Sequence, residues 1–92
     1  MKAINKYKKL LSLEDWEIYT IRILEEQVTY DTDVPNEDKY FIGITPNYYI
    51  KAATIYHDRD LTDEDILHEL LHVKLPNVSE SDINELTKIL IK

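Results

Sequence analysis

The amino-acid sequence predicts a single small α+β domain whose elements follow the order α-β-β-β-α-α. Apolar residues recur at helical spacing near both ends, and alternating β-branched and aromatic residues fill the middle of the chain. A chain of only 92 residues builds one modest hydrophobic core. No repeat or low-complexity linker divides it, so we expect residues 1–92 to form one domain around a three-stranded sheet.

The first predicted elements are a short amphipathic helix over residues 2–12 and a strand over residues 16–24. The helix has an apolar face and charged residues elsewhere, and its apolar positions are Ile4, Tyr7, Leu10 and Leu11. In the strand, apolar residues occur at both alternating positions, so we expect it to be buried on much of both faces. The acid-rich segment 25–38 is predicted to be a mobile surface loop.

Two further strands are predicted over residues 39–44 and 48–56. Thr45, Pro46 and Asn47 lie between them and have the residue types of a turn. The second of these strands leads directly into His57 and the polar residues that follow it.

The strongest helix signals surround the segment His68-Glu69-Leu70-Leu71-His72. Thr62 and Asp65 form a capping-box-like pair at its start, and Pro76 ends the helix after Leu75. Its apolar residues share one side: Ile66, Leu67, Leu70, Leu71 and Val73. The polar residues Asp65, His68, Glu69 and His72 fall on the opposite side. We therefore expect this helix to pack its apolar face in the core and to present its polar face to a functional site.

A last helix is predicted after Pro76, with Ser79 or Ser81 as its N-cap. Its apolar face consists of Ile83, Leu86, Ile89 and Leu90. The short connection from His72 requires a tight reversal, for which Pro76 and Asn77 are suited. The last helix is therefore expected to lie beside the preceding one.

The His-Glu-x-x-His pattern of residues 68–72 is typical of a zinc site. Two histidines four residues apart on a helix lie one turn apart, so both can bind one ion, with Glu69 on the same side. A structural zinc is closed by four protein ligands, whereas a hydrolytic zinc has three and leaves one position for water. A third ligand must therefore come from elsewhere. The candidates are His57, Glu80, Asp82 and Glu85.

Glu80 is the favoured third ligand, because Asn84 follows it by one turn and could steady a ligating histidine from the outer shell. Glu85 lies about half a turn around the helix from Glu80 and cannot share its direction. The alternative for Glu80 is a first-turn acid that complements the helix dipole. For His57 the simpler interpretation is a turn residue at a strand end.

The segment 68–72 followed by a helical Glu80 resembles the gluzincins, metallopeptidases that hold zinc with two histidines and a glutamate. The short chain and the short connection to Glu80 are similar to the minigluzincins, which are minimal zincin-like scaffolds. The chain also resembles small phage-encoded metallopeptidases that begin with an Asp-Trp-x-Ile strand, as Asp15 to Ile18 do here. Asn84 departs from the aspartate usual in larger gluzincins.

The resemblance implies a zinc-dependent endopeptidase in which His68, His72 and Glu80 bind Zn²⁺ and Glu69 is the general base. Zinc acidifies its bound water and polarises the peptide carbonyl, and Glu69 takes the water proton. The strand ending at residues 54–56 is expected to be the wall along which an extended peptide lies. A latent form is also envisaged, with the cleft covered by a terminal segment or a neighbouring molecule. The alternative is a non-catalytic metal-binding or protein-interaction module on the same scaffold.

Composition excludes several other classes of function. A net charge of −7 argues against nucleic-acid binding through phosphate neutralisation. The absence of cysteine excludes disulfides and a thiolate zinc site. No run approaches the length of a membrane span, and the N-terminus lacks a signal-peptide apolar core. We therefore expect a soluble cytoplasmic protein whose partner is a peptide or protein substrate.

Overall fold

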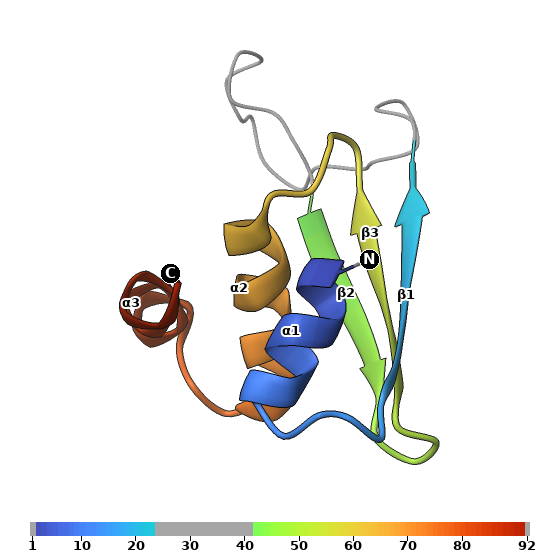
Figure 1. Ribbon diagram of the computed structural model, residues 1–92, viewed down its shortest axis with the longest axis horizontal. Coiled ribbons are helices and arrows are strands. Elements are labelled where there is room, and N and C mark those ends of the chain that lie inside the picture. The colour runs from blue at the N-terminus through green and yellow to red at the C-terminus, as the bar shows by residue number, and fades with distance from the viewer. Residues whose placement is uncertain (1, 24–41, 92) are drawn as a thin grey trace.

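The predicted element order is confirmed by the structure, a computed structural model that describes residues 2–23 and 42–91. Its elements are α1 Lys2–Leu10, β1 Glu17–Arg22, β2 Ile42–Asn47, β3 Ala52–His57, α2 Asp63–Lys74 and α3 Glu80–Leu90. Figure 1 shows the three helices on one side of the sheet, with α1 and α2 next to the strands and α3 farther out. The predicted loop 25–38 lies outside the described residues.

The sheet has the strand order β1-β3-β2, with β3 in the centre. β3 pairs with β1 in parallel and with β2 antiparallel, so Thr54 lies between Tyr19 and Thr45. In the part of the chain that the structure describes, β1 and β2 are therefore the two edge strands. The N-termini of β2 and α2 lie at the same end of the molecule, and the two elements run in the same direction (Figure 1).

The prediction that the first strand is buried on both faces is wrong. Ile18 packs against the core, but Tyr19 and Ile21 remain 55% and 45% exposed. Because the three helices share one side of the sheet, the side chains of β1 that point away from them contact no helix. The strand is also shorter than predicted, since Trp16 precedes it and belongs to the buried core.

The predicted turn at residues 45–47 is also wrong, because these residues form the second half of β2 and the turn comprises residues 48–51. The Oδ1 atom of Asn47 accepts hydrogen bonds from the N–H groups of Tyr49 and Ile50, which closes the turn. Lys51 follows in the left-handed region with a φ of 54°. An edge strand tolerates Pro46, since its missing N–H is not needed for pairing.

The first helix ends at Leu10, two residues earlier than predicted. Ser12 adopts a φ of 59°, and the N–H of Leu13 donates to the carbonyl of Lys8. This is the hydrogen-bond pattern of a Schellman motif, which stops the helix and turns the chain toward β1.

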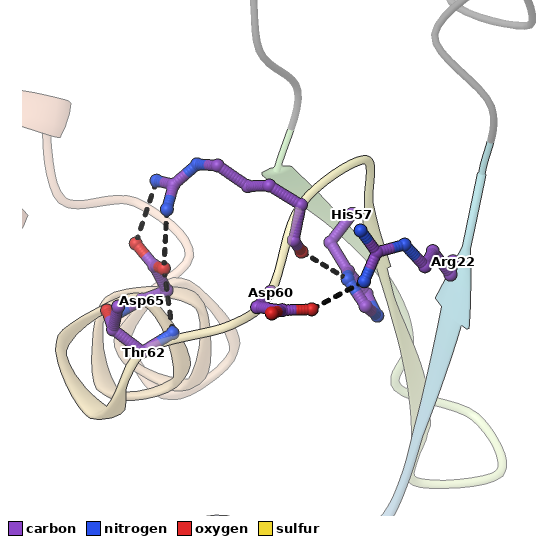
Figure 2. A network of polar contacts seen from close by, with 6 residues as sticks. Arg22, His57, Asp60, Thr62 and Asp65 are labelled. Atoms are coloured by element: carbon purple, nitrogen blue, oxygen red, sulfur yellow. Dashed lines mark hydrogen bonds and ion pairs between the residues drawn. The ribbon is translucent and has the colours of Figure 1, made fainter.

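The helix caps predicted for α2 and α3 are confirmed. Thr62 Oγ1 accepts from the N–H of Asp65 at 3.1 Å, and Asp65 Oδ2 accepts from the N–H of Thr62 at 2.9 Å (Figure 2). Ser79, rather than Ser81, caps α3 by accepting from the N–H of Asp82. All five apolar residues predicted for the core face of α2 are buried, and the helix is packed against both α1 and α3. These contacts fix the direction in which its polar face points.

Candidate metal centre

The two helices α2 and α3 bring His68, His72 and Glu80 together. The Nε2 atoms of the histidines lie 3.1 Å apart. One carboxylate oxygen of Glu80, Oε1, lies 2.7 Å from His68 Nε2, and the other, Oε2, lies 2.8 Å from His72 Nε2. Glu80 can reach both rings because it is the first residue of α3, directly after the Ser79 cap. Three side chains with metal-binding atoms therefore converge on one point.

These three residues fit a zinc ion. Zinc bonds of about 2.0–2.1 Å in a tetrahedron place neighbouring ligand atoms about 3.3 Å apart. The separation of the two histidine nitrogens, 3.1 Å, is close to that value. The distances from the Glu80 oxygens to these nitrogens are within about half an ångström of it. The donor set of two imidazoles and one carboxylate is that of catalytic zinc sites with three protein ligands. No fourth residue belongs to this group among residues 2–23 and 42–91.

The three side chains line a cleft of about 830 Å³ that is bounded by β2, α2 and α3. Solvent reaches them, since Glu80 is 63% exposed, His72 27% and His68 19%. The lining residues nearest to the N-terminus of α2 are Ile42, Gly43, Arg59, Glu64 and Asp65. Pro46, Tyr48 and Pro76, which lie at or just after the C-terminal ends of β2 and α2, line the opposite end. An extended chain running along β2 would therefore pass the histidines.

Glu69 lines the same cleft, but it is only 6% exposed. Burial, together with the negative charges of Glu80 and Asp65, raises the pKa of Glu69 to about 7 from its ordinary value of 4.5. A carboxylate with such a pKa exchanges protons near neutral pH, which is a property of general bases. The sequence placed Glu69 on the polar side of α2, and the structure adds that it is enclosed there.

Two of the other ligand candidates lie away from the metal-binding group. Asp82 belongs to the first turn of α3, where its N–H is held by Ser79. Glu85 is 3.8 Å from Lys88 on the exposed side of the same helix. Asn84 does line the cleft, but within residues 2–23 and 42–91 no hydrogen bond joins it to either histidine. The outer-shell role predicted for Asn84 remains a prediction.

His57 is likewise separate from the histidine pair, at the end of β3. Its Nδ1 atom lies 2.6 Å from the carbonyl oxygen of Arg59, within the turn that leads to α2 (Figure 2). The guanidinium of Arg59 contacts the carboxylate of Asp65 at 3.3 and 3.4 Å. In the same network Arg22 donates to Asp60 across the end of the sheet. The position of His57 agrees with the simpler interpretation of a turn residue.

The wall of the cleft is β2, so the prediction that the strand ending at residues 54–56 forms it is wrong. That strand, β3, pairs on both sides and has no edge to offer a peptide. Ile42, Gly43, Ile44 and Pro46 of β2 line the cleft instead. Pro46 was the signal available in the sequence, since proline within a strand indicates an edge.

Tyr48 is a cleft residue that the sequence could not single out from the other tyrosines. Its hydroxyl donates to the carbonyl of Val73 at 2.8 Å, and its ring packs edge-on against Trp16 with centroids 5.2 Å apart. Burial raises the pKa of the Tyr48 phenol. The residue therefore ties the turn after β2 to the last turn of α2.

Comparisons with protein-family models, curated proteins and solved structures find no match for this chain. Within the described residues, no helix has the length and apolar character needed to cross a bilayer. The class of protein must therefore be inferred from the site itself.

Proposed function

We propose that this protein is a zinc-dependent metallopeptidase of the gluzincin type. The observation that carries the proposal is the convergence of His68, His72 and Glu80 in a cleft that also contains the buried Glu69. A site that only binds metal has no need of a buried carboxylate beside its ligands, because burying an unpaired charge destabilises the fold. Hydrolysis does need that group as a base.

We assign each side chain of the cleft a separate role in peptide hydrolysis. His68, His72 and Glu80 would hold the ion, which when bound would supply Lewis acidity for the peptide carbonyl and for a water molecule. Glu69 takes a proton from the attacking water and passes it to the leaving amine. The low exposure of Glu69 keeps bulk water from competing for that proton.

The edge of β2 provides main-chain groups that can align an extended substrate. Pro46 lies opposite Ala53 and has no N–H, so this is a non-hydrogen-bonded position of the β2–β3 ladder. Hydrogen-bonded and non-hydrogen-bonded positions alternate along an antiparallel ladder, so Ile44, opposite Ile55, is also a non-hydrogen-bonded position. The N–H and C=O of Ile44 therefore point toward the outer edge of β2. Ile44 also lines the cleft. A peptide adding to this edge as a strand would be held beside the histidines.

The test is cleavage of unfolded protein and peptide libraries by the zinc-loaded protein, analysed by mass spectrometry. Glu69→Gln should abolish cleavage while zinc content, measured in parallel, remains at one ion per chain. Glu85→Gln is the matched control, since it removes a carboxylate from α3 outside the cleft. Equal cleavage by the wild type and by Glu69→Gln would refute the proposal.

A latent form of the enzyme is part of the same proposal. Of the residues described, none from α1 lines the cleft, and α3 contributes only Glu80 and Asn84. Cover by a terminal segment or a second molecule therefore remains a prediction. The prediction of a latent form fails if the zinc-loaded protein cleaves at once and truncation at either end leaves the rate unchanged.

The alternative function, a metal-binding or interaction module, would gain support if zinc binds with His68, His72 and Glu80 but no substrate is ever cleaved.

A further inference from the structure

We propose that Glu64 makes the cleft selective for peptides with a lysine or arginine side chain shortly after the scissile bond. This inference rests on the proposed peptidase function. It concerns a residue that the metal site does not use and that the HExxH pattern does not include.

The position of Glu64 relative to the metal site follows from helix geometry. Glu64 precedes His68 by four residues on α2, so the two side chains lie on one face about 6 Å apart along the axis. Both line the cleft. An extended peptide advances about 3.4 Å per residue. A substrate side chain one or two positions from the metal-bound carbonyl is therefore opposite Glu64.

Among the residues that the structure describes, Glu64 is the carboxylate at this end of the cleft for which no cationic partner is found. Of the other lining carboxylates, Glu80 faces the histidines and Asp65 is bound by Arg59. Glu69 is buried. Glu64 is exposed, and no hydrogen bond or ion pair joins it to any residue in the ranges 2–23 and 42–91. A cationic substrate side chain would supply the missing partner.

The direction of the substrate follows from the shared orientation of β2 and α2. Antiparallel addition is the slightly more stable form of strand pairing. A peptide antiparallel to β2 runs from the Tyr48 end of the cleft toward Ile42 and the N-terminus of α2 (Figure 1). Its residues after the scissile bond therefore approach Glu64, and those before it approach Tyr48.

The experiment uses peptide hydroxamates, because the hydroxamate binds zinc and fixes the register of the peptide without any turnover. One set carries the hydroxamate at its N-terminal end and has Lys, Gln or Glu at the second position after it. Binding to the zinc-loaded protein is measured by calorimetry. We expect the Lys probe to bind about two- to fivefold more tightly than the Glu probe, the range of an exposed ion pair. High salt should reduce that ratio.

Asp63→Asn is the matched control for Glu64→Gln. Both substitutions remove one negative charge from the first turn of α2, but Asp63 does not line the cleft. Glu64→Gln should bring the ratio of the affinities for the Lys and Glu probes close to one, while Asp63→Asn should leave most of the preference for the Lys probe. The inference is overturned by equal binding of the two probes, or by equal effects of the two substitutions. It is also overturned if the preference occurs only with peptides that carry the hydroxamate at their C-terminal end.

The same measurements separate this inference from the proposed function. If the Lys preference depends on Glu64 but the protein cleaves no peptide, the peptidase proposal fails and the subsite is retained. If peptides are cleaved without regard to Lys, Gln or Glu at these positions, the peptidase proposal stands and the subsite fails.

Discussion

Replacing Glu69 by Gln should abolish hydrolysis and, at the same time, remove a pH-dependent loss of stability from the metal-free protein. The buried carboxyl of Glu69 has a pKa of about 7 in the folded chain, against 4.5 as its ordinary value. The folded state therefore retains a proton there between these two values, while the unfolded chain has lost it. Stability from this proton is fully present below the lower value and is lost as the pH rises through the higher one.

The size of the effect follows from the same two values. At about 1.4 kcal/mol per tenfold change in proton affinity, the shift corresponds to about 3 kcal/mol over the full range. Between about pH 5 and about pH 8 the free energy of unfolding should therefore fall by about 2 to 3 kcal/mol more in the wild type than in Glu69→Gln. Glutamine is neutral throughout, so the variant lacks this slope.

The assay is urea unfolding in the presence of a chelator, at several pH values, for the wild type, Glu69→Gln and Glu85→Gln. Glu85 is exposed on α3, so its variant should follow the wild type. Saturating zinc should remove the difference between the wild type and Glu69→Gln, because a nearby cation favours the ionised carboxylate. Parallel pH dependences for the wild type and Glu69→Gln without metal would refute the reasoning.

The remaining predictions concern the third ligand and two contacts of α2. Glu80→Gln should weaken zinc binding, measured by competition with a chromogenic chelator, by at least about 100-fold, whereas unchanged affinity would exclude Glu80 as a ligand. Thr62→Ala should lower the free energy of unfolding by about 1 kcal/mol through loss of the α2 cap; no change in urea unfolding would contradict this. Tyr48→Phe should cost about 1 kcal/mol by the same assay, because it removes the bond to Val73 and keeps the ring on Trp16. A Tyr48→Phe variant as stable as the wild type would show that water replaces that bond.

Much of the candidate metal centre could be anticipated, because the arrangement of its two histidines is encoded locally. His68 and His72 meet because they are one helical turn apart, and the Thr62 cap sets where that turn begins. Glu80 could be favoured because Asn84 follows it by one helical turn, and the structure adds that the Ser79 cap makes Glu80 the first residue of α3. Each of these interactions spans only a few residues, so a pattern in the sequence is enough to anticipate them.

The strands were predicted less well, because their boundaries and exposure depend on partners far along the chain. Pro46 and Asn47 have turn chemistry, but pairing with Ala53 and Ala52 extends β2 through both of them. The apolar residues of β1 suggested burial on two faces, yet the helices cover only one. The residue types of a strand do not indicate which strand will pair with it or which helix will cover it.

By itself, the sequence determined the element order, the capped helix with one apolar and one polar face, and the His-Glu-x-x-His group with its following glutamate. Only the tertiary structure decided that β3 is central and that the edge of β2 borders the cleft. It also decided that Glu69 is buried and that Glu64 is exposed. The physical reason is that helix turns and caps form between near neighbours, whereas strand order and burial arise from contacts between distant segments.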